Sequence, residues 1–135
     1  MKKILFICWY NSARSQMAEG LLRNFGKDKF DVYSAGIESA EINPKAVKVM
    51  EEIGIDISGQ SSKTVERYLN EEFDEVITVC DSAEQACPFF AKAKNRRHWD
   101  FPDPEKVQGT EEEILEAFRT SRDSIKTKIE ESFLA

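Results

Sequence analysis

The sequence predicts an α/β fold, a small four-stranded parallel sheet with helices on both faces. Apolar runs that suit buried strands alternate along the chain with segments whose apolar residues recur at helical spacing. Strands that alternate with helices in this way form parallel sheets covered on both sides. The 135 residues contain no internal repeat and no linker rich in Pro, Gly or Ser. We therefore expect one domain over residues 1–135.

Two strands and one helix are expected at the start of the chain. Residues 3–8 (KILFIC) are an almost continuous apolar run, as expected of a strand buried on both faces. A helix should follow, because apolar residues between Met17 and Phe25 recur three or four positions apart, and Gly26 ends the pattern. Residues 30–35 (FDVYSA) are expected to form the second strand.

Capping residues locate the next helices. Asn43 is a suitable cap and is followed by Pro44, which predicts a helix from there to about Ile53, just before Gly54. We expect a third helix over residues 63–70.

The second half of the chain is expected to supply two strands and the longest helix. Residues 75–80 (EVITVC) predict a buried strand, and residues 96–99 (RRHW) a weaker one. Thr110 and Glu113 have the spacing of a capping box. Apolar residues at helical spacing extend this last helix to Phe133.

The segment that follows the first strand predicts an anion-binding loop: Trp9, Tyr10, Asn11, Ser12, Ala13 and Arg14. Backbone N–H groups in such a loop can turn inward, and the next helix adds partial positive charge. Arg14 can bind two oxygens of a tetrahedral oxyanion. The same groups favour a thiolate, and Ser15 can donate to the sulfur, so we expect Cys8 to be a nucleophile with a lowered pKa. Taken alone, the pattern also fits a buried cysteine beside an unrelated arginine.

Cys80 and Cys87 complete a set of three cysteines. If the strands that end at Cys8 and Cys80 are neighbours, their backbones lie about 5 Å apart. A disulfide requires Cα atoms within roughly 7 Å, so a bond between these two is feasible. Cys87 follows after mostly small or polar residues that can rearrange to bring it to Cys80. Spacing alone leaves open that Cys80 fills the core and Cys87 is incidental. The single histidine and scattered cysteines predict no zinc site, and we expect no metal.

Several stretches together resemble the low-molecular-weight protein tyrosine phosphatases and the thioredoxin-coupled arsenate reductases that share their fold. The run from Asn11 to Gly20 is similar to the reductase signature. The similarity continues through most of the chain, at Tyr33 to Ile37, Asn43 to Ala46, Ile55 to Ser58, Cys80 to Pro88 and His98-Trp99. It implies a low-molecular-weight phosphatase-like fold.

The resemblance also implies an activity, the reduction of arsenate to arsenite by a relay of Cys8, Cys80 and Cys87. The reductases carry the two later cysteines at the corresponding places, and a phosphatase has no chemical need of them. Asp103 matches the family's general acid, although an aspartate before proline also fits a turn when read alone. Phosphate and sulfate would compete with arsenate, thioredoxin would donate the electrons, and no cofactor is expected.

The sequence departs from the family at a few positions. Trp9 and Tyr10 stand where the reductases usually have small residues, which bears on substrate preference. Ala13 replaces a cysteine that many members carry.

Some members hold a potassium ion through residues that correspond to Asn11, Glu19 and Ser34. Lys63 stands where those members have a further acidic ligand. The Lys63 ammonium could pair with Glu19 and replace the ion, so we predict no potassium site. We interpret His98 and Trp99, which also match the family, as structural.

Two other functions remain as alternatives. A phosphatase would use the same loop, but Glu105 and Lys106 follow the Asp-Pro pair where phosphotyrosine-binding members carry aromatic residues. A non-enzymatic arsenite sensor would bind As(III) through three thiolates and would leave Asp103 without a purpose.

Composition narrows the partners and the location. The net charge of −6 disfavours nucleic acid and anionic membranes as partners. No apolar stretch approaches the ~20 residues that cross a bilayer. With an odd number of cysteines and no disulfide framework, we expect a cytoplasmic protein.

Overall fold

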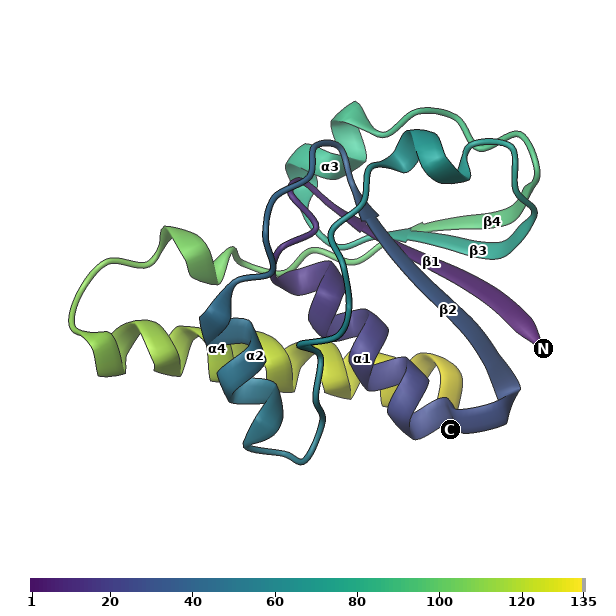
Figure 1. Ribbon diagram of the computed structural model, residues 1–135. Helices are drawn as coiled ribbons and strands as arrows, with labels where there is room; N and C mark the ends of the chain where they lie inside the picture. Colours follow the sequence, from purple (N-terminus) through teal and green to yellow (C-terminus); the bar gives the residue numbers. More distant parts are fainter. Residues whose placement is uncertain (135) are drawn as a thin grey trace.

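The computed structural model describes residues 1–134 and contains one sheet of four parallel strands (Figure 1). The strands are β1 (Lys2–Cys8), β2 (Phe30–Gly36), β3 (Phe73–Thr78) and β4 (Ala93–His98), in the order β2-β1-β3-β4. β1 lies between β2 and β3, and its residues from Ile4 to Cys8 are buried, as expected of a strand covered on both faces. The predicted fold class is confirmed.

Helices cover the two faces of the sheet unequally. In Figure 1, α1 (Arg14–Gly26), α2 (Pro44–Glu51) and α4 (Glu111–Ile129) lie below the sheet, while α3 (Asp81–Ala86) and a 3₁₀ turn (Val65–Tyr68) lie above it. On the side of α4, the ring of Trp99 packs against Phe6 and Phe133. Residues 1–134 contain no helix that is both long and apolar enough to cross a membrane.

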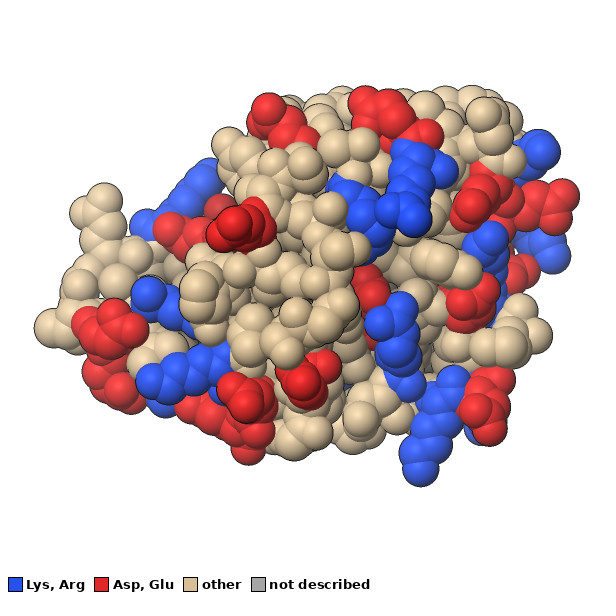
Figure 2. Space-filling view, viewed as in Figure 1, with Lys and Arg blue, Asp and Glu red and all other residues tan. Residues whose placement is uncertain are grey.

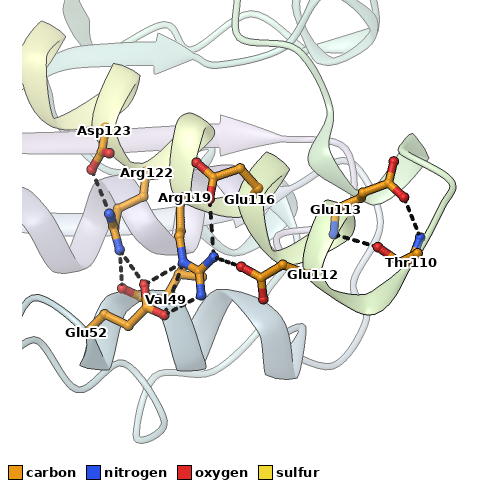
Figure 3. A network of polar contacts seen from close by, with 9 residues as sticks. All are labelled: Val49, Glu52, Thr110, Glu112, Glu113, Glu116, Arg119, Arg122 and Asp123. Carbon is orange, nitrogen blue, oxygen red and sulfur yellow. Dashed lines mark hydrogen bonds and ion pairs between the residues drawn. The ribbon is translucent and has the colours of Figure 1, made fainter.

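Side-chain contacts join α2 to α4 (Figure 3). Glu52, which follows α2, accepts hydrogen bonds from Arg119 at 2.9 Å and from Arg122 at 3.0 Å. Arg122 also donates to the Val49 carbonyl at 2.8 Å. Hydrogen bonds from Arg119 lower the pKa of Glu52. Together these contacts hold α4 against α2.

Most predicted elements are present, with shifted ends. α1 begins at Arg14, directly after the loop, and α2 ends at Glu51. β4 begins at Ala93 and not at residue 96. The predicted capping box at the start of α4 is confirmed, and a π-helical turn (Glu130–Leu134) follows the helix.

The prediction of a helix over residues 63–70 is wrong. Here the chain runs extended beside the end of β2, because Lys63 O accepts from Gly36 N–H at 2.8 Å and Thr64 bridges to Gly36. Asn11 Oδ1 accepts the Lys63 N–H at 2.9 Å. These partners satisfy the backbone in an extended conformation, and only the 3₁₀ turn of Val65–Tyr68 follows.

The predicted strand over residues 75–80 also ends early. β3 stops at Thr78, and Cys80 is the N-cap residue of α3. Cys80 therefore does not end a strand as Cys8 does. Val79 N–H still donates to the Ile7 carbonyl at 2.8 Å, so the chain stays beside β1 up to this point.

Candidate active site

The Cys8 loop lies at the carboxyl end of β1, against the end of β2. Ile37 N–H donates to the Cys8 carbonyl at 3.2 Å, and Glu38 N–H donates to the Trp9 carbonyl at 2.9 Å. Gly36 permits this approach, because a Cβ atom there would lie 2.7 Å from Asn11 N and 2.8 Å from Trp9 O. The close fit fixes the path of the loop in front of α1.

Asn11 organises the loop from its centre. Its φ of 54° is left-handed, as expected of an asparagine in a tight loop. The buried side chain donates from Nδ2 to Ser15 Oγ at 2.8 Å and to Ser34 Oγ at 2.9 Å. Because Ser15 Oγ accepts this bond, its own proton is free to point at Cys8.

Cys8 is buried, and its Sγ lies 2.8 Å from Ser15 Oγ. Burial raises the pKa of the Cys8 thiol, and the hydrogen bonds from the Ser15 side chain and backbone only partly oppose this rise. The prediction of a lowered pKa is therefore wrong for the ligand-free site. Loss of solvent around the sulfur outweighs the donors that favour the thiolate.

Arg14 helps Cys8 less than expected because its guanidinium already has partners. Nη1 donates to the Phe101 carbonyl at 2.8 Å, and Nη2 lies 3.4 Å from Asp103 Oδ2. Part of its positive charge is thus compensated by Asp103, and Arg14 lowers the Cys8 pKa less than the hydrogen bonds from Ser15 do. A guanidinium has five N–H donors, so others remain for an oxyanion.

A cavity of about 270 Å³ opens in front of Cys8. Residues of the loop, of α3 and of the turn after β4 line it: Cys8, Trp9, Tyr10, Ser12, Arg14, Ser82, Asp103, Glu105 and Lys106. The structure thus brings the predicted nucleophile, the predicted anion-binding arginine and the predicted acid to one cavity. Ala13 is the residue before α1 and offers no side-chain cap.

Glu105 belongs to the site, although its sequence pattern indicated only a missing aromatic residue. Its carboxylate accepts hydrogen bonds from Ser12 Oγ at 2.9 Å and from Asn43 Nδ2 at 2.9 Å. Its N–H donates to Asp103 Oδ1 at 2.9 Å, which caps a short 3₁₀ turn. The turn therefore orients Asp103, and Glu105 fastens it to the Cys8 loop. In the sequence, the only indication that Glu105 belongs to the site was its position directly after the Asp-Pro pair.

The two bulky loop residues lie at the rim of the cavity. The Trp9 side chain donates from Nε1 to Glu38 Oε2 at 2.8 Å. Tyr10 is 48% exposed, and its carbonyl accepts from Ser62 Oγ at 3.0 Å. Both residues line the cavity in front of Cys8.

Cys80 and Cys87 lie at the two ends of α3, and all three cysteines are free thiols. Cys80 is buried beside Cys8, close enough to contribute to the raised pKa of Cys8. Cys87 is half-buried, and burial raises the pKa of its thiol as well. At 1.5 Å per residue, the helix separates the two Cα atoms by roughly 10 Å. A disulfide needs less than about 7 Å, so α3 must unwind before Cys80 and Cys87 can bond.

Polar side chains hold α3 in place. Thr78 Oγ1 donates to Glu84 Oε2 at 2.5 Å and also lies 2.8 Å from His98 Nδ1. His98 Nε2 lies 2.8 Å from Asp81 Oδ1. These bonds support the structural role expected of His98.

One group of side chains within residues 1–134 could hold a metal ion by its geometry. It consists of Asp81, His98 and Asp100, whose ligand atoms lie within 4.8 Å of one another. All three are exposed, and His98 is already hydrogen-bonded.

The expected pairing of Lys63 with Glu19 is wrong. Glu19 accepts from Ser34 Oγ at 2.5 Å and pairs with Arg23 at 2.7 Å. Lys63 Nζ donates instead to the Ser61 carbonyl. Arg23 is therefore the cation in contact with Glu19, and the charge of Lys63 acts on it without an ion pair. Glu19, Arg23 and Lys63 line a hollow of about 690 Å³ that contains none of the cysteines.

Charges of both signs are mixed over the face of the molecule seen in Figure 2. With a net charge of −6, the protein as a whole repels anions. Attraction of an oxyanion must therefore come from the local donors around Cys8.

Comparison with known proteins places the fold and the loop in context. The family model for low molecular weight phosphotyrosine protein phosphatase matches residues 3–134. An arsenate reductase from Halalkalibacterium halodurans is 50% identical over 128 residues, which cover 95% of this chain and 92% of the relative. An arsenate reductase from Bacillus subtilis is 45% identical over 130 residues, with 96% and 94% covered.

Solved structures agree. A structure described as an arsenate reductase in the phosphate binding state has a TM-score of 0.84 and 39% identity, and the match covers 97% of this chain and 95% of that one. The YwlE arginine phosphatase from Geobacillus stearothermophilus has a TM-score of 0.77 and 27% identity, with 96% and 89% covered. The chain therefore belongs to the low molecular weight phosphotyrosine protein phosphatase family.

Proposed function

We propose that this protein reduces arsenate to arsenite through a relay of Cys8, Cys80 and Cys87. The observation that carries the proposal is the position of the cysteines: one faces the anion cavity, and two more flank the short helix beside it. The relatives described above as arsenate reductases support it, and one related structure is described as binding phosphate, a tetrahedral oxyanion like arsenate.

In the first step, arsenate occupies the cavity with its oxygens on the loop N–H groups and Arg14. The Cys8 sulfur attacks arsenic and forms an S–As bond. One arsenate oxygen leaves as water, protonated by Asp103, whose carboxyl group lines the same cavity. Arsenic remains As(V) at this stage. Burial favours the protonated form of the Cys8 thiol, so we expect its proton to pass to the bound oxyanion before the attack.

The second step reduces arsenic. The Cys80 sulfur attacks Cys8 Sγ, the electron pair of the S–As bond moves to arsenic, and arsenite leaves as As(III). A Cys8–Cys80 disulfide forms, so two thiols have supplied two electrons. Cys80 is suited to this attack because it is already beside Cys8.

The third step frees the cavity. α3 unwinds, Cys87 attacks Cys80, and Cys8 leaves as a thiol. Because α3 has six residues, its unfolding is inexpensive by comparison with that of a longer helix. A dithiol protein of the thioredoxin class then reduces the Cys80–Cys87 disulfide and restores the enzyme.

Hydrolysis of phosphate esters is the second candidate, because the loop, Arg14 and Asp103 serve that reaction too. The likeness to an arginine phosphatase at 27% identity is the observation in its favour. A phosphatase has no step that uses Cys80 or Cys87. Weak hydrolysis of aryl phosphates is therefore expected as a side activity.

One assay separates these functions. Arsenate-dependent oxidation of NADPH is followed with thioredoxin and thioredoxin reductase, beside hydrolysis of p-nitrophenyl phosphate. We expect NADPH oxidation that requires both arsenate and thioredoxin and that disappears in Cys8→Ser. Fast ester hydrolysis without arsenate-dependent NADPH oxidation would establish a phosphatase instead.

A further inference from the structure

Phe89 is the most exposed aromatic residue among residues 1–134, with 82% of its surface open to solvent. The next are Tyr10 at 48% and Phe25 at 39%. Phe89 lies two residues after Cys87, on the loop that leads from α3 to β4. Single exposed apolar side chains are common on protein surfaces, but this ring stands beside the cysteine that the proposed relay oxidises last.

The loop holds Phe89 outward. The neighbouring Phe90 is 4% exposed, and its ring packs edge-on against Phe73 with centroids 6.4 Å apart. Arg96 donates to the Pro88 carbonyl at 3.3 Å and to the Glu84 carbonyl at 3.2 Å, on the other side of Cys87. Because Phe90 is buried and the Pro88 carbonyl is hydrogen-bonded, the backbone on both sides of Phe89 is held in place and its side chain points into solvent.

Reduction of the Cys80–Cys87 disulfide requires contact with this surface. A thiolate of the reducing protein must attack one sulfur in line with the S–S bond. In the reduced protein, Cys87 is half-buried and Cys80 is 2% exposed, so Cys87 is the sulfur nearer the surface before α3 unwinds. The attack forms a mixed disulfide with Cys87 and releases Cys80; the partner's second thiol then displaces Cys87. One dithiol is oxidised and one disulfide is reduced.

We infer that Phe89 is the anchor on which a dithiol protein of the thioredoxin class docks to reach Cys87. This inference rests on the proposed relay, in which Cys87 ends in a disulfide. A partner whose thiolate reaches Cys87 must also cover residues adjacent in the loop, and Phe89 projects there. Buried aromatic side chains near the centre of an interface contribute a large share of its affinity.

The charged residues that follow Phe89 indicate which charges the partner should carry around its apolar patch. Lys92, Lys94, Arg96 and Arg97 follow Phe89 within eight residues, in a chain whose net charge is −6. Lys94, Arg96 and Arg97 pair with Asp74, Glu84 and Glu75, so Lys92 is the cation of this group that has no ion pair with the described residues. A partner with an apolar patch and acidic residues beside it fits this surface.

The test uses full-length protein oxidised beforehand to the Cys80–Cys87 disulfide, so that it does not depend on arsenate. Reduced thioredoxin is mixed with the wild type, with Phe89→Ala and with Phe25→Ala, and the second-order rate of reduction is measured. Phe25 is the matched control, because it is an exposed phenylalanine on α1. We expect Phe89→Ala to slow reduction about tenfold and Phe25→Ala to leave it unchanged. Reduction by dithiothreitol should be equal in all three.

The proposed docking surface would be overturned if thioredoxin reduced Phe89→Ala at a rate within twofold of the wild-type rate. It would also be overturned if thioredoxin did not reduce the oxidised wild type. An equal loss with dithiothreitol would also overturn it, because the loop would then be altered chemically. If thioredoxin reduction depends on Phe89 but arsenate causes no thiol oxidation, the docking surface stands and the proposed function fails.

Discussion

Replacement of Ser15 by alanine should raise the pKa of Cys8 further. Ser15 Oγ lies 2.8 Å from Cys8 Sγ, and this hydrogen bond opposes the effect of burial. A hydrogen bond to a charged group contributes about 1.5–3 kcal/mol. One pKa unit corresponds to about 1.4 kcal/mol, so the shift should be about one to two units upward. Below both midpoints, the thiolate fraction should fall roughly 10- to 100-fold.

The assay is the rate of Cys8 alkylation by iodoacetamide between neutral and alkaline pH, with Cys80 and Cys87 replaced by serine in every variant. Ser121→Ala is the control, because Ser121 Oγ is a buried hydroxyl that has no hydrogen-bond partner within the described residues. It should leave the alkylation midpoint unchanged. A midpoint in Ser15→Ala equal to that of its parent would refute the role assigned to the Ser15 hydroxyl.

Three further predictions concern the relay, the acid and the fold. Cys80→Ser and Cys87→Ser should each abolish thioredoxin-coupled turnover of arsenate while hydrolysis of p-nitrophenyl phosphate stays near the wild-type rate; parallel loss of both activities would show that these cysteines are structural. Asp103→Asn should slow single-turnover arsenate reduction about a hundredfold or more, against little change in the exposed control Asp100→Asn. Glu52 has a lowered pKa in the folded state, so it adds stability above its unfolded pKa of about 4.3, and this is lost as the pH falls through the folded value. Urea unfolding of Glu52→Gln should therefore show lower stability at neutral pH and a smaller loss below pH ~4; an unchanged acid dependence would contradict the contribution of this carboxylate.

The Cys8 loop shows what local sequence could predict. A buried strand followed by a short loop and a helix places Cys8 and Arg14 on one side of the sheet without knowledge of any distant contact. Asn11 was predictable for the same reason, because its left-handed φ is a local preference. Asp103 required the family resemblance, since an aspartate before proline is equally common in turns.

Features that depend on distant partners were not predictable. Residues 63–70 had helical character, but Gly36 and Asn11 bind the backbone of Lys63 and keep it extended. The pKa of Cys8 was misjudged because its burial, and the partners Phe101 and Asp103 that engage Arg14, arise only in the folded chain. The role of Glu105 could not be predicted for the same reason, because its partners Ser12 and Asn43 are far away in sequence.

Identification of the first disulfide tests the relay most directly. Cys80 lies beside Cys8, whereas Cys87 is separated from Cys80 by the length of α3. Cys87→Ser treated with one equivalent of arsenate, without thioredoxin, should therefore stop with a Cys8–Cys80 disulfide, detected by peptide mapping and mass spectrometry. Cys80→Ser should form no intramolecular disulfide on the same timescale. A predominant Cys8–Cys87 disulfide in the wild type after a single turnover would contradict the proposed order.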